Sequence, residues 1–242
     1  MSRLPKRSFL DFLGKKVLIL GDVRTGKTRL TTFFLQEAIN LGFITEITVI
    51  DMAPKTTVVG DLILGGRLFE KSKIPKGLRY LSPRCVYTPR LSSRCARELL
   101  ELVEKNRRRI LPLLRSYLSK PTPILFANDL SIYLQSGDMM TIQRVVQTAS
   151  TFVGNGYFGT TLMGDFNTGV SQMERELMER LAATMDIRIR LESKRLGNAS
   201  DLKGEDIISN GIGYSTLKAT LSEAMLAYMR KPKGAFYSSH RS

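Results

Sequence analysis

Two glycines, a lysine and a threonine near the N-terminus have the types and the spacing that phosphate binding requires. Residues 21–28 read Gly-Asp-Val-Arg-Thr-Gly-Lys-Thr and match the pattern GxxxxGK(S/T). In this pattern the glycines let backbone N–H groups wrap a phosphate, the lysine neutralises phosphate oxygens, and the hydroxyl group suits Mg²⁺. We therefore predict a phosphate-binding loop in which Lys27 is catalytic and Thr28 is a metal ligand. The expected contacts with the bound phosphates are Gly21, Asp22, Val23, Arg24, Thr25, Gly26, Lys27, Thr28 and Arg29.

A carboxylate that could accompany such a loop ends an apolar stretch farther along the chain. Residues 124–129 read Ile-Leu-Phe-Ala-Asn-Asp, which is typical of a buried strand followed by two polar residues. We expect Asp129 to hold Mg²⁺ through a water molecule, and so to be both a metal-site residue and a catalytic residue. If Asn128 takes that place instead, Asp129 becomes the candidate for polarising an attacking water.

Two more polar side chains follow expected strands. Asp51 closes the apolar stretch 46–51, and Asn167 comes shortly after the stretch 160–164. Ligands of open parallel sheets bind at the carboxyl ends of the strands, so we expect these side chains to face one crevice. There Asp51 would position water as a catalytic residue, and Asn167 would contact the terminal phosphate. The alternative for each is a capping role in its own loop.

The elements that must position these residues alternate between strands and helices. Such alternation predicts an α/β fold with a doubly wound, mostly parallel sheet. The expected strands are 15–20, 46–51, 124–127, 160–164 and 186–191. The expected helices are 27–41, 92–118 with a kink or break at Pro112, 139–153 and 170–184.

The same pattern of elements predicts that the chain consists of a core and a C-terminal extension. Residues 1–192 form a core, which includes a basic insertion and helix at 67–120. Residues 193–242 form a C-terminal extension packed on that core, with a short strand at 206–209, a helix at 216–230 and a basic tail.

The positive charge of the chain is large and unevenly distributed. The 242 residues carry 37 Lys and Arg against 22 Asp and Glu, a net charge of +15, and 67–120 contributes 15 basic and four acidic residues. This concentration predicts that 67–120 contacts the phosphates of nucleic acid. The arginines expected to do so are Arg79, Arg84, Arg90, Arg94, Arg107, Arg108 and Arg109. The alternative is a solvated helix face whose arginines pair with Glu98, Glu101 and Glu104.

The composition also excludes several classes of protein. The single histidine, His240, excludes zinc sites built on paired histidines and Ser-His-Asp hydrolysis as the main chemistry. No apolar run approaches the roughly 18 residues of a membrane span, and the basic N-terminus lacks the pattern of a signal peptide. We therefore expect a cytoplasmic protein.

The phosphate-loop pattern and the strand ending in Asp129 together resemble the P-loop ATPases of RecA-like type. The run Asp129-Leu-Ser-Ile is similar to the Asp-Ser-Leu run that ends the Mg²⁺ strand of KaiC- and RadA-like ATPases. This resemblance covers roughly 15–215 and implies ATP, Mg²⁺ and a homo-oligomer. The chain departs from the family because no glutamate follows Asp51 within ten residues. Motor ATPases of the HerA and FtsK kind place a glutamate beside the Mg²⁺ aspartate, where this chain has Leu130.

These observations predict a RecA-like P-loop protein that binds ATP, hydrolyses it, and acts on or with nucleic acid. One alternative is a small-molecule kinase on the same core, with arginines of 79–97 gripping a phosphorylated acceptor. A GTPase ranks last among the alternatives, because base selection by GTPases uses NKxD and the nearest string, 198–201, lacks the lysine. The missing glutamate keeps a non-catalytic nucleotide-binding scaffold as a further alternative.

Overall fold

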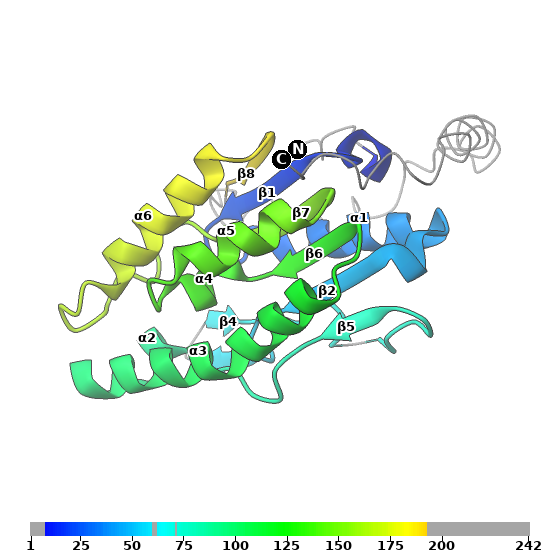
Figure 1. The fold of residues 1–242 in the computed structure, drawn as a ribbon. Coiled ribbons are helices and arrows are strands. Elements are labelled where there is room, and N and C mark those ends of the chain that lie inside the picture. The colour runs from blue at the N-terminus through cyan, green and yellow to red at the C-terminus, as the bar shows by residue number, and fades with distance from the viewer. Residues whose placement is uncertain (1–7, 60–61, 71, 193–242) are drawn as a thin grey trace, which may run out of the picture. The chain divides into compact units, whose positions relative to one another are not determined.

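An all-parallel sheet is the centre of the structure, a computed structural model that describes residues 8–59, 62–70 and 72–192 (Figure 1). The order across the sheet is β5-β2-β6-β7-β1-β8, so that one strand, β7, separates β1 from β6. The six strands are β1 (Lys16–Gly21), β2 (Ile47–Asp51), β5 (Arg79–Leu81), β6 (Ile124–Asn128), β7 (Thr151–Tyr157) and β8 (Ile187–Leu191). A separate antiparallel pair joins β3 (Thr57–Val59) to β4 (Leu62–Leu64). Because the six strands run in the same direction, their carboxyl ends share one edge.

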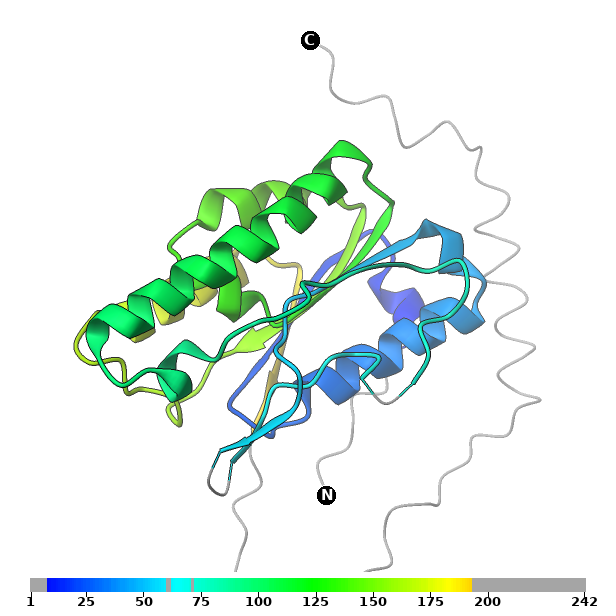
Figure 2. The ribbon, with the colours of Figure 1, turned by 90° about the horizontal axis from the view of Figure 1, so that it is seen from below.

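Helices cover both faces of this sheet (Figure 2). The helices described are α1 (Lys27–Asn40), α2 (Pro89–Ser92), α3 (Ala96–Ser119), α4 (Leu130–Leu134), α5 (Met139–Thr148) and α6 (Val170–Ala183), with 3-10 turns at Phe9–Phe12 and Phe43–Glu46. On the face of α1, the ring of Phe9 stacks on Phe126 of β6, and Phe12 meets Phe34 of α1 edge to face. These aromatic contacts fix α1 against the sheet and so fix the loop that leads into it.

The opposite face is covered by α3, α4, α5 and α6. One hydrophobic cluster joins Leu18, Leu125 and Phe152 of three strands to buried side chains of these four helices. Because both faces are covered, the central strands β2 and β6 consist mainly of buried apolar side chains. Their polar residues are Thr48, Asp51 and Asn128, and the last two end their strands. The predicted class, an α/β fold with a doubly wound parallel sheet, is confirmed.

The fourth strand lies about nine residues earlier than the sequence pattern predicts. The expected strand 160–164 is part of a loop, whereas the expected helix 139–153 ends at Thr148 and is followed at once by β7. Gly154 and Gly156 weaken the strand pattern of β7, but both positions are closely packed. A Cβ at Gly154 would lie 2.5 Å from Phe152 and 2.8 Å from Leu130 of α4, and one at Gly156 would lie 2.5 Å from Met178 of α6. The glycines let two helices approach the centre of the sheet closely.

The long basic helix also differs from the prediction. The expected helix 92–118 corresponds to the 24-residue α3, which begins four residues later, after the short α2, and continues through Pro112 without a break. Pro112 lies on the exposed side of α3, so that the carbonyl group left without its N–H partner can be hydrated. Buried side chains hold both halves of α3: Leu99 packs with Val170 of α6, and Ile110 and Tyr117 belong to the large cluster on the sheet.

Residues 67–90, the first part of the predicted basic insertion, contain one strand of the main sheet. Strand β5 pairs with β2 from Arg79 to Leu81 and forms the edge of the sheet. The predicted strand 206–209, the helix 216–230 and the boundary at 192–193 lie at or beyond the end of the described residues and stay predictions.

Candidate nucleotide-binding site

The loop between β1 and α1 has the backbone conformation that its glycines permit. Strand β1 ends at Gly21 and α1 begins at Lys27. A Cβ at Gly21 would lie 2.6 Å from the carbonyl oxygen of Leu191, so only glycine allows β8 to pass this closely. Gly26 precedes the helix in the left-handed region with φ of 91°, and Arg24 also has a positive φ of 58°. The loop therefore turns sharply and directs the N-terminus of α1 toward the carboxyl edge of the sheet.

Lys27 is half-buried at the start of α1 and is oriented by its own loop. Its Nζ atom donates a hydrogen bond of 2.6 Å to the carbonyl oxygen of Asp22. Burial lowers the pKa of Lys27, while the negative charges of Asp129 and Asp22 act in the opposite direction. The ammonium group of Lys27 and the carboxylate of Asp129 therefore interact electrostatically within a partly desolvated site.

Asp129 stands between β6 and α4 in a left-handed conformation with φ of 59°. Its Oδ1 atom accepts a hydrogen bond of 2.7 Å from the hydroxyl of Ser131, and its backbone N–H donates to Oδ1 of Asn155 at 3.0 Å. Burial raises the pKa of Asp129, against the hydrogen bond from Ser131 and the positive charge of Lys27. The left-handed backbone is uncommon for a non-glycine residue and occurs at functional sites.

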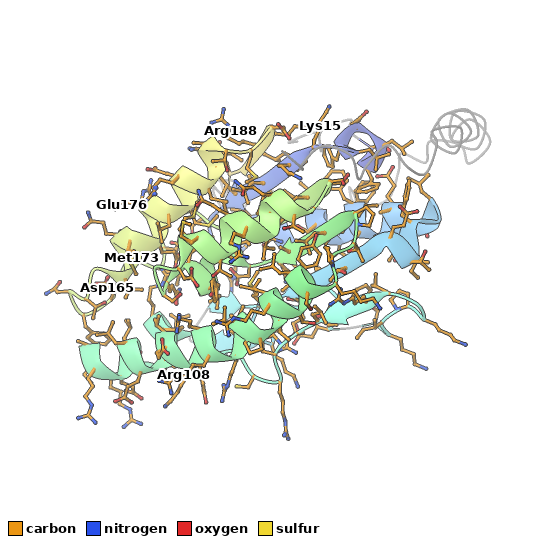
Figure 3. All side chains as sticks on the ribbon, viewed as in Figure 1. Lys15, Arg108, Asp165, Met173, Glu176 and Arg188 are labelled. Atoms are coloured by element: carbon orange, nitrogen blue, oxygen red, sulfur yellow. The ribbon has the colours of Figure 1, made fainter. Side chains whose placement is uncertain are left out.

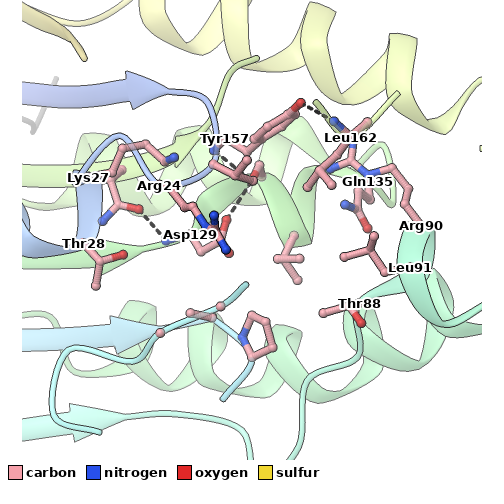
Figure 4. Close-up of a pocket in the computed structure, with 18 of the residues that line it drawn as sticks. Arg24, Lys27, Thr28, Thr88, Arg90, Leu91, Asp129, Gln135, Tyr157 and Leu162 are labelled. Carbon is pink, nitrogen blue, oxygen red and sulfur yellow. Dashed lines mark hydrogen bonds between the residues drawn. The ribbon is translucent and has the colours of Figure 1, made fainter. Parts of the chain in front are cut away.

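These residues meet in one pocket of about 430 Å³ at the carboxyl edge of the sheet (Figure 4). This volume lies within the range of small-molecule sites. Lys27, Thr28 and Asp129 line one part of the pocket, and Arg90 and Gln135 line another. Of the predicted phosphate contacts, Val23, Arg24, Gly26, Lys27, Thr28 and Arg29 line the pocket, and Gly21, Asp22 and Thr25 shape the loop behind it.

The residues present fit a bound Mg²⁺ together with phosphates. The hydroxyl of Thr28 and the carboxylate of Asp129 both line the pocket, and only one oxygen of Asp129 accepts the bond from Ser131. In the described ranges, no cluster of three or more carboxylate, histidine or cysteine side chains forms a protein-only metal cage. Mg²⁺ is commonly bound by one or two carboxylates with substrate phosphates and waters, which agrees with this sparse arrangement.

Asp51 lies near Asp129 but turns into the sheet rather than into the pocket. It is fully buried and accepts four hydrogen bonds: from the hydroxyl of Tyr80 at 2.6 Å, from Nδ2 of Asn128 at 2.8 Å, and from the backbone N–H groups of Leu68 and Ala53. Burial raises the pKa of Asp51. The structure therefore gives Asp51 a place in the interior, where all its bonds are to protein, and does not bring it into contact with the pocket.

The hydrogen bonds continue from Asp51 across the sheet to α1. Nδ2 of Asn155 donates to Oδ1 of Asn128 and to the hydroxyl of Thr31, each at 2.8 Å. A buried polar chain therefore joins β5, β2, β6, β7 and α1. Asn128 belongs to this chain, so Asp129 rather than Asn128 presents its side chain to the pocket. Asn155 was not anticipated from the sequence, because it lies in the middle of a strand whose position was predicted wrongly.

Asn167 lies in the loop between β7 and α6, away from the pocket lining. It is exposed and has a positive φ of 59°, while its neighbour Asp165 accepts the backbone N–H of Ser171 near the start of α6. Figure 3 shows Asp165 in this loop at the end of α6. Tyr157, the last residue of β7, lines the pocket instead. The structure therefore does not bring Asn167 into the pocket.

A buried ionic cluster borders the pocket on the side of α2. Arg90 of α2 forms an ion pair of 3.0 Å with Glu174 of α6, and Nη1 of Arg90 donates to the carbonyl oxygen of Leu162. Its guanidinium group also lies 5.1 Å from the ring centroid of Tyr157. Gln135 donates its Nε2–H to Glu174 at 2.7 Å. Burial raises the pKa of Glu174 to about 7. The cluster was not anticipated, because its members are far apart in the sequence.

The arginines of 67–120 divide into paired and exposed side chains. Arg79 donates to backbone carbonyls of Ser116 and Lys120, Arg90 faces the pocket, and Arg109 lies 4.6 Å from the ring centroid of Tyr87. Arg107 and Arg108 share Glu104, the pairing that a solvated helix face predicts.

The outer side of α3 still carries a stripe of basic side chains, here defined as Arg97, Lys105, Arg108 and Arg115. All four are exposed, and Arg97 and Arg115 are 18 residues apart, or five helical turns, so they point in the same direction. Figure 3 labels Arg108 on this outer side. In the part of the chain that the structure describes, Lys105 and Arg115 form no ion pair.

Comparisons with known proteins add little to this geometry. No family model matches the sequence, and a search of curated proteins found no match. The crystal structure of Pif1 helicase from Candida albicans matches with a TM-score of 0.33 and 11% sequence identity, over 80% of this chain and 40% of that chain. A likeness this weak carries no argument about function. None of the helices in the described residues is long and apolar enough for a membrane span.

Proposed function

We propose that this chain is a RecA-like P-loop ATPase that binds ATP with Mg²⁺, hydrolyses it, and acts on or with nucleic acid. The observation that carries the proposal is the meeting of Lys27, Thr28 and Asp129 in one pocket at the carboxyl edge. The single strand β7 between the strands that lead to the loop and to Asp129 supports the RecA-like assignment, because that type places one strand between them.

Each residue has a role that follows from its position. Backbone N–H groups of the loop and the N-terminus of α1 would hold the phosphates. Lys27 would exchange its bond to the carbonyl oxygen of Asp22 for bonds to phosphate oxygens. Thr28 and Asp129 would hold Mg²⁺, which when bound supplies charge neutralisation to the phosphates.

The proposed nucleic-acid surface is the basic stripe of α3. Its four side chains are exposed. Arg97 and Arg108 each pair with a glutamate on the same helix, and Lys105 and Arg115 form no ion pair in the described residues. A long helix with cations on one side can contact several phosphates of a duplex or a single strand without reading the bases.

The test is an ATPase assay with purified full-length chain. We expect phosphate release that requires Mg²⁺, that stops when EDTA is added, and that increases when duplex DNA, single-stranded DNA or RNA is present. Failure of the chain to bind a fluorescent ATP analogue would contradict the proposal for the pocket. Turnover that no nucleic acid changes would contradict only the proposal for the stripe.

A second candidate function is phosphoryl transfer to a small molecule. It is favoured by Arg90, which lies in 79–97 and lines the same pocket as Lys27. Against it, the charge of Arg90 is already balanced by Glu174 at 3.0 Å, so the guanidinium group is not available as an unpaired cation for a phosphorylated acceptor. In the same assay, consumption of ATP without release of inorganic phosphate, and only when a metabolite is present, would favour the kinase.

A further inference from the structure

The side chains around Asp129 offer no obvious group to orient a water molecule. Leu130 follows Asp129 where a carboxylate would be useful, and Asp51 is buried with all its bonds to protein. Both ends of the amide group of Asn155 already have hydrogen-bond partners: Oδ1 accepts the N–H of Asp129, and Nδ2 donates to Thr31 and Asn128. The hydroxyl of Ser131 donates to Asp129 and accepts the backbone N–H of Tyr157. An ATPase built on this pocket needs another hydrogen-bond acceptor for the attacking water.

Gln135 is the pocket-lining side chain with an acceptor left over. It is 1% exposed, and its Oε1 atom has no hydrogen-bond partner in the protein. Its backbone N–H donates to the carbonyl oxygen of Ser131, so Gln135 lies one turn along α4 from the residue that bonds to Asp129. A buried polar atom without a partner is unfavourable, and in a pocket wall it indicates a bond completed by a bound group that donates a hydrogen.

The orientation of the amide group follows from the chemistry of its neighbour. In the ionised form that pairs with Arg90, Glu174 only accepts hydrogen bonds, and its Oε2 atom lies 2.7 Å from Nε2 of Gln135. The NH₂ end must therefore face Glu174, which leaves the carbonyl end free. Arg90 fixes Glu174 in turn through Nη2 and is itself anchored on the carbonyl oxygen of Leu162. Arg90 of α2 and Glu174 of α6 thus hold the amide group of Gln135 at the end of α4, so that its Oε1 atom stays in one position.

We propose that Oε1 of Gln135 accepts a hydrogen bond from the water that attacks the γ-phosphate, an inference that rests on the proposed ATPase function. In this step the water oxygen forms a bond to the γ-phosphorus, and the bond from that phosphorus to the β,γ-bridging oxygen breaks. Its electron pair leaves with ADP. One hydrogen stays on the attacking oxygen and the other moves to a γ-phosphate oxygen, which gives dihydrogen phosphate. Gln135 is not a base and orients the water, a role that glutamine can fill in phosphoryl transfer.

The experiment compares Gln135→Met with the control Gln147→Met in single-turnover hydrolysis of Mg·ATP. Methionine keeps the length of the side chain and removes the amide oxygen. Gln147 is an exposed residue of α5 outside the pocket lining. We expect Gln135→Met to slow hydrolysis by roughly ten- to a hundredfold, to leave the Kd of a fluorescent ATP analogue within about twofold, and the control to match the wild type.

A second variant separates this role from a structural one. Gln135→Asn keeps the amide group but withdraws it by one carbon, so it should also lose turnover, and it serves if the methionine variant does not fold. Wild-type rates in folded Gln135→Met or Gln135→Asn, or a loss of ATP affinity equal to the loss of rate, would overturn the inference alone. A wild-type chain that never hydrolyses ATP would overturn the proposed function as well.

Discussion

The phosphate loop and α3 both concentrate positive charge, but they hold it in different ways. Lys27 is half-buried, is hydrogen-bonded to its own loop and interacts electrostatically with Asp129. Lys105 and Arg115 on α3 are exposed and form no ion pair in the described part of the chain, and Arg108 has only an i,i+4 partner in Glu104. A fixed cation in a partly desolvated site selects one ligand geometry, whereas exposed cations on long side chains attract many phosphates and are screened by salt.

The comparison predicts that the two regions respond differently to the loss of one charge. In the loop, a single substitution should remove a defined step of the reaction. On α3, a substitution should change the strength of binding by a small, graded amount, because each cation contributes separately.

The largest effect is expected for Lys27→Ala. Lys27 is the one lysine in the pocket lining, so its removal should abolish ATP turnover. The fold should remain intact, because the ammonium group makes one bond to a backbone carbonyl. Turnover is measured by phosphate release, with circular dichroism as the control for folding. A folded variant that hydrolyses ATP at the wild-type rate would mean that the loop does not bind the phosphates of ATP.

Asp129→Asn should have the next largest effect. The amide cannot supply the negative charge that a metal site requires, so we expect turnover to fall by about 10²-fold. Nucleotide affinity should fall only modestly, since the loop still holds the phosphates. Steady-state kinetics and titration with a fluorescent ATP analogue measure the two quantities. Equal losses of both would indicate a structural role for the carboxylate.

The basic stripe of α3 should show its effect in the salt dependence of binding. Replacing Lys105, Arg108 and Arg115 with glutamine should lower the slope of log affinity against log salt by up to about 2.7 on duplex DNA, since each phosphate contact contributes about 0.9. The affinity for ATP should not change. A matched variant with Arg144, Arg180 and Arg188 replaced loses the same charge from other exposed positions. Equal slopes for the two variants in fluorescence anisotropy would exclude α3 as the surface.

A smaller, pH-dependent effect is expected from Glu174. Burial raises its pKa from an ordinary 4.5 to about 7 in the folded chain, so the folded state binds the proton more tightly than the unfolded state does. The contribution of this proton to the free energy of unfolding is therefore complete below about pH 4.5 and is lost as the pH rises to about 7. Glu174→Gln should remove this part of the pH dependence in urea denaturation between pH 5 and 7.5. An unchanged dependence would contradict the assigned pKa.

The phosphate loop could be predicted from the sequence because its information is local. Two glycines, Lys27 and Thr28 lie within eight residues, directly after an apolar strand. Asp129 could be predicted for the same reason. Strand β7 could not, because Gly154 and Gly156 are explained only by the approach of α4 and α6, which are distant elements.

The roles of Asp51 and Asn167 show the limit of the rule that ligands bind at strand ends. The rule identifies the edge of the sheet but not the direction of a side chain. Asp51 turns into the interior, because Tyr80, Asn128 and two backbone groups satisfy it there. The cluster of Arg90, Gln135 and Glu174 escaped prediction because Gln135 and Glu174 are 39 residues apart and no short motif joins them.

The most direct test is a crystal structure of the chain with a non-hydrolysable ATP analogue and Mg²⁺. We predict that the β- and γ-phosphates lie within hydrogen-bond distance of the loop N–H groups and Nζ of Lys27, with Mg²⁺ on the hydroxyl of Thr28 and linked to Asp129 through water. A nucleotide bound elsewhere, or bound in this pocket with its phosphates away from Lys27 and Asp129, would contradict the proposed site.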